Sequence, residues 1–166
     1  MWPNTALLDL LSIDHPIIQA PMAGATTPAL AAAVSNAGGL GSLGCAFMTP
    51  ERTGEEIAKT MMATNRSINV NFFVHEPPGD DTQKNASAKE QLQPYFDEYG
   101  LGNMPEVVPT NFPFDEAMLA VMLELRPRVV SFHFGLPSQH MVEALKEVGI
   151  VVLSSATTVR EAVILA

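Results

Sequence analysis

An α/β fold with a parallel sheet is the class that this sequence of 166 residues predicts, and two observations predict it. Short apolar runs alternate with helix-like stretches, and such alternation implies parallel strands joined by right-handed crossovers. The composition, 47% hydrophobic and 16% charged, is sufficient to build a core. Two architectures fit, an open flavodoxin-like sheet and a (β/α)8 barrel. Length favours the open sheet, because a barrel typically needs about 250 residues.

Five runs of apolar or small residues are predicted to be strands. The clearest of them alternates Ile68 and Val70 with Asn69 and Asn71, the period of a half-buried strand. In chain order the predicted strands are 16–20, 40–44, 67–74, 128–134 and 150–153.

The helices are predicted from start and stop signals together with apolar spacing. Thr49 followed by Pro50 and Glu51 combines a capping residue, a proline at the first position and an early acid, and Gly149 is a typical stop. The predicted helices are 28–37, one opening at 49–51, 86–99, 115–125, 138–148 and 158–166. Residues 75–85 are expected to be a polar loop and 100–114 an irregular link.

Charge and cysteine content exclude several classes of protein. The chain has 9 Lys plus Arg against 18 Asp plus Glu, a net charge of -9, and no basic cluster of the kind that binds nucleic acid. The one cysteine, Cys45, excludes an internal disulfide framework and suggests a reducing compartment, the cytoplasm. The uncharged stretch 15–50 is interrupted by proline and glycine, so we expect no membrane span there. Residues 1–14 lack the basic start of a secretory signal.

Polar residues gather near the ends of the predicted strands. Asn69 and Asn71 alternate with apolar neighbours in one strand, Ser131 and His133 do so in another, and Gln19 does so in the first. A parallel sheet covered by helices on both faces should be apolar on both. In a barrel, inward polar residues near the upper rim form a ligand site, so this pattern favours the barrel. The alternative is that these side chains cap neighbouring loops.

The segment from Gln19 to Gly24 combines small residues with a proline-fixed turn. Such a turn lets backbone groups approach a flat ligand, with Met22 as a soft apolar contact. A tight strand-to-helix turn without a ligand would use the same residues, and the local chemistry does not decide between the two.

Four blocks in this order resemble the nitronate monooxygenase family, formerly called 2-nitropropane dioxygenase. They are PIIQAPMAG at 16–24, AAAVSNAGGLGS at 31–42, NVNFF at 69–73 and SFHFG at 131–135. The resemblance implies an FMN-containing (β/α)8 barrel. It also implies oxidation of alkyl nitronates, of the propionate 3-nitronate type, by O2 to a carbonyl compound and nitrite.

The resemblance also assigns roles to individual residues. It places four residues at the flavin ring, namely Ala20, Pro21, Met22 and Ala23. It makes Asn71 a hydrogen-bonding contact to the flavin and puts His133 on the substrate side, where an imidazole can bind an anionic nitronate or handle a proton. The alternative for His133 is a hydrogen-bonded core histidine.

The sequence departs from the family pattern after 157–162. There the family continues into a block with a second histidine and the glycine-rich turns that hold the FMN phosphate, whereas this sequence ends at Ala166. We therefore expect one domain over 1–166, an incomplete barrel of about the first five β/α units. We expect this chain to be poorly stable, to bind FMN weakly unless another chain completes the barrel, and to offer open edges for self-association.

Whether so short a chain keeps the nitronate activity is open, and two alternatives remain. One is another FMN-barrel oxidoreductase of the enoyl-reductase type. The other is a non-catalytic fragment or interaction module.

Several further motifs are interpreted as structural. The run 39–44 satisfies G-x-G-x-x-G but follows a helix and forms a strand, so we interpret it as a thin strand against which helices pack. Cys45 is expected to be buried and unreactive. Glu51, Glu55 and Glu56 are expected on an exposed helix face. The four histidines, His15, His75, His133 and His140, have no metal-ligand spacing.

Overall fold

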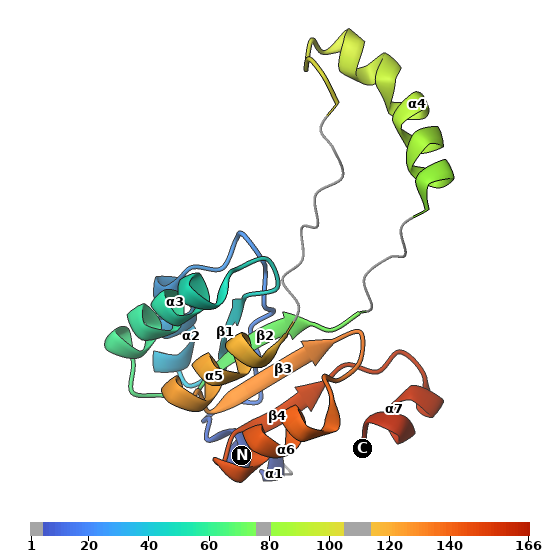
Figure 1. Ribbon diagram of the computed structural model, residues 1–166. Helices are drawn as coiled ribbons and strands as arrows, with labels where there is room; N and C mark the ends of the chain where they lie inside the picture. The colour runs from blue at the N-terminus through green and yellow to red at the C-terminus, as the bar shows by residue number, and fades with distance from the viewer. Residues whose placement is uncertain (1–4, 76–80, 105–113) are drawn as a thin grey trace. The chain divides into compact units, whose positions relative to one another are not determined.

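The computed structural model describes residues 5–75, 81–104 and 114–166, which fall into two compact units (Figure 1). The larger unit contains residues 5–75 and 114–166. The smaller unit is built around α4 (Thr82–Glu98), which starts four residues before the predicted helix because Asp81 caps it by accepting a hydrogen bond from the Lys84 N–H at 3.0 Å. Parts of the predicted loop and link, 76–80 and 105–113, lie outside the described residues.

The larger unit is organised around a parallel sheet of four strands, β1 (Gly41–Gly44), β2 (Ile68–Phe73), β3 (Val129–His133) and β4 (Val151–Ser154). Each strand pairs with the next one in the sequence, in the order β1-β2-β3-β4. Doubly wound sheets reverse their order at a switch point, whereas a (β/α)8 barrel keeps sequence order around its wall. The predicted α/β class is confirmed, and the strand order agrees with the barrel.

Helices flank and connect the strands, and those other than α1 begin within one residue of the starts that the sequence signals predicted. They are α1 (Ala6–Leu11), α2 (Pro28–Asn36), α3 (Pro50–Ala63), α5 (Glu116–Leu125), α6 (Gln139–Glu147) and α7 (Val159–Leu165). Thr27, Thr49, Asp115 and Thr158 each cap the following helix by accepting a hydrogen bond from a backbone N–H three residues on.

One face of the sheet packs against α2, α3, α5 and α6 and forms the main core (Figure 1). Leu43 of β1, Val70 and Phe72 of β2, and Val130 and Phe132 of β3 are almost wholly buried there. The helices contribute apolar residues that are also buried, among them Ala31, Ile57, Met118, Met122, Met141 and Leu145.

The opposite face is apolar at the amino ends of the strands and polar toward their carboxyl ends. Leu11 and Ile13, at the end of α1 and just after it, pack with Leu40 and Val129 in a second, smaller cluster. Farther along the same face lie Ser42, Asn69, Asn71, Ser131 and His133, here called the polar face. The alternation in the sequence therefore predicted correctly which residues share a side of the sheet.

The predicted first strand, 16–20, is reduced to a single parallel bridge between Ile18 and Leu40. Pro16 and Pro21 flank this segment, and proline lacks the N–H that would extend the pairing in either direction. Helix α1 was not predicted; it is short, and only Leu11 among its residues is buried.

Strand β1 confirms the structural interpretation of the glycine motif. A Cβ at Gly41 would lie 1.9 Å from the carbonyl oxygen of Ala31 in α2, so only glycine lets this helix pack so closely on the strand. The Gly41 N–H also donates to the Ser35 hydroxyl of α2 at 3.1 Å.

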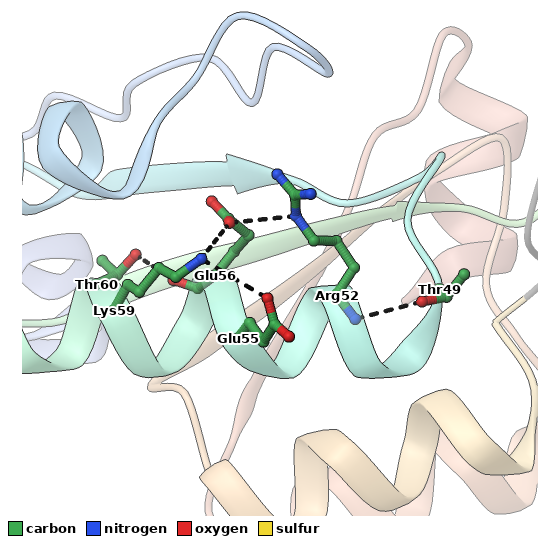
Figure 2. A network of polar contacts seen from close by, with 6 residues as sticks. All are labelled: Thr49, Arg52, Glu55, Glu56, Lys59 and Thr60. Carbon is green, nitrogen blue, oxygen red and sulfur yellow. Dashed lines mark hydrogen bonds and ion pairs between the residues drawn. The ribbon is translucent and has the colours of Figure 1, made fainter.

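The prediction that Glu56 lies on an exposed helix face is wrong, because Glu56 is only 7% exposed. Figure 2 shows its carboxylate between two cations of the same helix: Oε1 lies 3.2 Å from Arg52 Nε and 3.0 Å from Lys59 Nζ. These ion pairs at i−4 and i+3 compensate the burial of the charge. Glu51 and Glu55 are exposed as predicted.

Candidate functional site

The turn at residues 19–26 is fastened to β1 by side chains. The Gln19 amide donates through Nε2 to the Ser42 carbonyl and to Thr26 Oγ1, both at 3.3 Å, and its Oε1 accepts from the Ser42 N–H at 3.4 Å. Thr26 Oγ1 also accepts from the Met22 N–H at 3.1 Å. The hydrogen bonds of the Gln19 side chain therefore hold the turn in place over the polar face.

Gly44 brings this turn into direct contact with the sheet. A Cβ at Gly44 would lie 2.7 Å from the Ala23 nitrogen and 3.0 Å from the Met22 carbonyl carbon. Gly44 is aligned with Asn71 in the parallel register, so its missing side chain would point to the same side as that amide. The turn at Met22 and Ala23 thus lies on the polar face, beside Asn71.

Asn71 is buried and held in one orientation. It is 1% exposed, and its Nδ2 donates to the Ser131 hydroxyl at 3.0 Å and to the Ser131 carbonyl at 3.2 Å. Both donor positions of the amide are therefore used on β3, which leaves Oδ1 as its remaining polar atom.

His133 lies two residues beyond Ser131 on the same face and is partly buried. Its Nδ1 lies 2.8 Å from Oγ of Ser155, which follows β4. Within the described part of the chain, Nε2 of His133 has no hydrogen-bond partner. A fixed imidazole with one free nitrogen can bind an anion or exchange a proton there.

Aromatic rings border His133 at the carboxyl rim. Phe73, its register partner on β2, has its ring centroid 5.9 Å from that of His133 and 5.1 Å from that of Phe134. Phe47 packs edge-on against Phe73 at 5.8 Å. Phe134 is 63% exposed and has a left-handed φ of 69°, which only a few per cent of non-glycine residues adopt. The rim therefore offers an apolar wall next to the imidazole.

The polar face also contains an unpartnered oxygen. Asn69 is 2% exposed and donates through Nδ2 to Ser42 Oγ at 3.1 Å, but its buried Oδ1 has no partner among the described residues. A donor from a ligand or a water would satisfy it.

The residues assigned to a flavin ring have chemistry that fits such a ring. Met22 is 42% exposed despite its apolar thioether. The N–H groups of Ala20 and Ala23 have no hydrogen-bond partner in the described ranges. Free backbone donors beside a soft apolar side chain suit a flat ring with acceptor atoms along its edge, as in FMN.

Sequence reasoning missed three residues that fasten this site. Thr26 and Ser155 were not identified, and the Ser42 hydroxyl was not recognised as the partner of Asn69. Extending the alternation of β4 by one residue would have placed Ser155 on the polar face, in line with His133. No sequence signal identifies Thr26, because its role depends on the path of the turn.

Cys45 and His140 lie apart from the polar face, whereas the ring of His75 packs at its rim, with its centroid 5.4 Å from that of Phe134. Cys45 is buried in the main core, and burial raises the pKa of its thiol to about 12. His140 of α6 pairs through Nε2 with Glu116 of α5 at 2.7 Å. Across residues 5–75, 81–104 and 114–166, no group of three or more His, Cys, Asp and Glu is arranged to hold a metal ion. Nor is any helix within those ranges long and apolar enough to cross a membrane.

Comparison with known proteins gives a consistent result. The sequence model of the family described as nitronate monooxygenase matches residues 4–166. The chain is 49% identical over 159 residues to the nitronate monooxygenase of Paraburkholderia phytofirmans, covering 95% of this chain and 43% of that protein. It is 44% identical to the nitronate monooxygenase of Pseudomonas aeruginosa, covering 92% and 44%.

Solved structures agree with the sequence relatives. Nitroalkane oxidase from Streptomyces ansochromogenes superposes with a TM-score of 0.85 at 35% identity, covering 96% of this chain and 45% of that one. FabK from Thermotoga maritima superposes with a TM-score of 0.67 at 28% identity, covering 95% and 39%. The likeness to nitroalkane oxidase and the sequential parallel strands confirm the predicted fold class, a partial (β/α)8 barrel, with four strands rather than five. The chain spans less than half the length of the relatives it matches.

Proposed function

The chain belongs to the nitronate monooxygenase family, and from this premise we propose that its polar face is the ring-binding and substrate-binding part of an FMN-dependent, nitronate-oxidising site. The reaction would convert alkyl nitronates of the propionate 3-nitronate type, with O2, to a carbonyl compound and nitrite. The observation that supports this most is that the turn at Met22, Asn71 and His133 occupy one face at the carboxyl ends of neighbouring strands.

In this proposal the chain supplies placement and electrostatics. FMN, when bound, supplies the redox chemistry. Met22 contacts the ring, the N–H groups of Ala20 and Ala23 donate to its acceptor atoms, and Pro21 fixes the backbone of the turn. Asn71 offers Oδ1 to a donor on the ring, because Ser131 occupies its Nδ2.

His133 binds the substrate. A nitronate carries a negative charge, and Nε2 of His133 can donate a hydrogen bond to it or take up a proton during turnover. Ser155 holds the imidazole through Nδ1. The neighbouring Phe73 and Phe134 provide apolar surface for the alkyl part of a small nitronate.

The proposed ligands are small molecules, namely the nitronate, O2 and FMN. A cytoplasmic location is proposed on the ground that the only cysteine, Cys45, is a buried free thiol.

Nitrite release from propionate 3-nitronate in the presence of FMN tests the proposal. At an FMN concentration high enough to offset the weak binding expected above, we expect turnover, and a loss of about a hundredfold in His133→Ala because a positioned acid–base group typically contributes 10²–10⁴-fold. His140→Ala is the matched control, since His140 pairs with Glu116 away from the polar face. Equal rates in the two variants would contradict the role of His133.

The open alternatives give different results in the same assay. Quenching of FMN fluorescence without nitrite release would favour another FMN-barrel reaction, such as that of an enoyl reductase. Neither quenching nor nitrite would favour a non-catalytic module.

A further inference from the structure

A hollow lies at the end of the sheet opposite the polar site. It has a volume of about 550 Å³ and is formed by the segments that precede β2, β3 and β4. Ser67 and Ile68 line it at the start of β2, Arg128 before β3, and Gly149 and Ile150 before β4. This volume is within the range of about 300–1,000 Å³ that is usual for small-molecule pockets.

Positive charge is concentrated in this hollow. Arg66, Arg126 and Arg128 line it, three of the five arginines in a chain whose net charge is -9. None of the described lining residues is acidic, although acids outnumber bases two to one in the sequence. We call this site the basic groove.

Two of the three guanidinium groups lack a carboxylate partner among the described residues. Arg66 pairs with Asp14 at 3.0 Å. Arg126 donates through Nε to the Leu123 carbonyl at 3.2 Å, and Arg128 donates to the Leu10 carbonyl at 2.9 Å. Neither Arg126 nor Arg128 forms an ion pair with any residue that the structure describes.

The hydrogen bonds of Arg126 and Arg128 to backbone carbonyls stabilise the ends of helices but leave most of the guanidinium N–H donors unused. Both arginines satisfy carbonyls at the ends of helices, the favourable position for a cation. A guanidinium has five N–H donors. Arg126 uses one, and Arg128 uses one at 2.9 Å and one at 3.5 Å. The contacts therefore anchor the side chains while leaving most donors available.

We propose that the basic groove binds a small phosphate-bearing anion, such as a diphosphate or a phosphorylated metabolite. The planar fork of arginine matches the oxygens of a phosphate group in a bidentate manner. Asn65 lines the same hollow, and its side-chain amide adds a neutral hydrogen-bond donor. The groove is separate from the polar face, so this proposal stands independently of the nitronate chemistry.

Calorimetric titration of the full chain with inorganic pyrophosphate tests this inference. We expect saturable binding at about 0.01 M salt that weakens toward about 0.1 M, as the Debye length shortens from roughly 30 Å to roughly 10 Å. Inorganic phosphate should bind more weakly than pyrophosphate, because it carries less charge. No saturable binding of pyrophosphate by the folded chain would overturn the proposal.

Two variants locate the site. Arg126→Gln should weaken pyrophosphate binding by about tenfold or more, the usual effect of losing a charge-assisted contact. Arg160→Gln removes the same charge from an exposed residue outside the groove and should leave binding unchanged. Equal affinities in the two variants would overturn the proposal.

A second measurement uses the unaltered chain, so that a folding defect in Arg126→Gln is not mistaken for a loss of pyrophosphate binding. In ¹⁵N-resolved spectra of the unaltered chain, pyrophosphate should shift the amide signals of Ser67 and Gly149. Shifts confined to other regions would contradict the assignment as firmly as absent binding.

Discussion

The Nδ1 atom of His133 lies 2.8 Å from the hydroxyl oxygen of Ser155, across the boundary between β3 and the end of β4. Among the described residues it is one of three contacts in which a serine hydroxyl, on a neighbouring strand or directly after it, holds a side chain of the polar face. The other two are Ser42 with Asn69 and Ser131 with Asn71. This repeated arrangement means that the pairing of neighbouring strands fixes the orientation of the His133 imidazole.

Ser155→Ala should therefore release the His133 ring. We expect altered ¹⁵N shifts of both ring nitrogens and a fall of about fivefold in kcat/KM for propionate 3-nitronate, equivalent to one hydrogen bond of roughly 1 kcal/mol. Ser155→Thr keeps the hydroxyl and should restore both properties. Ring shifts in Ser155→Ala that match those of the unaltered chain would show that Ser155 does not orient the imidazole.

Gly41→Ala should destabilise the larger unit strongly. The added Cβ would lie 1.9 Å from the Ala31 oxygen and 2.6 Å from the Ala31 carbonyl carbon, both backbone atoms that move only with α2. We expect a loss of about 3 kcal/mol or more, the upper end for overpacking. Urea unfolding followed by circular dichroism measures the loss.

Gly54→Ala provides the matched control for Gly41→Ala. Gly54 lies within helix α3. A Cβ there would contact only Val121 Cγ1 of α5, at an ordinary van der Waals distance of 3.6 Å. Alanine should stabilise the helix by about 0.5–1 kcal/mol. Similar urea midpoints for the two variants would refute the close approach of α2 to β1.

Glu56→Gln tests the buried carboxylate of α3. The substitution removes both ion pairs, and Glu56 is buried while Arg52 and Lys59 are more than half exposed. We therefore expect a loss of about 1 kcal/mol in the free energy of unfolding, between the values for an exposed pair and for a buried one. Glu55→Gln, which removes only an exposed pair at 3.7 Å, should change stability by less than about 0.5 kcal/mol. A larger loss in Glu55→Gln than in Glu56→Gln would contradict the arrangement in Figure 2.

Cys45 should be unreactive while the chain is folded. Burial raises the pKa of its thiol to about 12; the Thr53 hydroxyl opposes this shift and the Glu56 carboxylate adds to it. Alkylation by iodoacetamide at pH 8 should therefore be slow until urea unfolds the chain, because the thiolate is the nucleophile. Rapid labelling without urea would contradict the burial.

The same shift predicts a dependence of stability on pH. The thiol has a pKa of 9.0 when unperturbed and about 12 in the folded chain, so the unfolded state ionises first as the pH rises. Its contribution to stability is complete below pH 9 and is lost between pH 9 and 12. Cys45→Ala should make the decline over this interval shallower. If stability falls with pH between 9 and 12 as steeply in Cys45→Ala as in the unaltered chain, the raised pKa of the Cys45 thiol would be contradicted.

Much of the fold could be predicted because local signals and tertiary packing agree here. Strands β2 and β3 have a strict alternation, and the caps Thr27, Thr49 and Asp115 mark helix starts within one or two residues. Segment 16–20 could not be predicted as a single bridge, because its apolar composition indicates a strand while its flanking prolines limit the pairing. The burial of Glu56 was not predictable either, since it depends on how α3 packs and not on the helix alone.

The candidate site was predictable in part for the same reason. A period of two puts Asn71, Ser131 and His133 on one side of a sheet, whatever the surroundings. The supporting contacts of Thr26 and Ser155 depend on the path of the chain between elements, which periodicity does not encode. The roles proposed at the flavin and the substrate rest on the family resemblance together with the shared face.

Titration of the ¹⁵N-labelled chain with FMN tests the central claim most directly. If the polar face binds the ring, the signals of the Ala23 amide, the Asn71 side-chain amide and the His133 ring should shift together and saturate. Signals from α6 should stay in place and serve as the internal reference. Saturable FMN binding that moves signals around Arg126 and leaves those of Ala23, Asn71 and His133 unmoved would contradict the account.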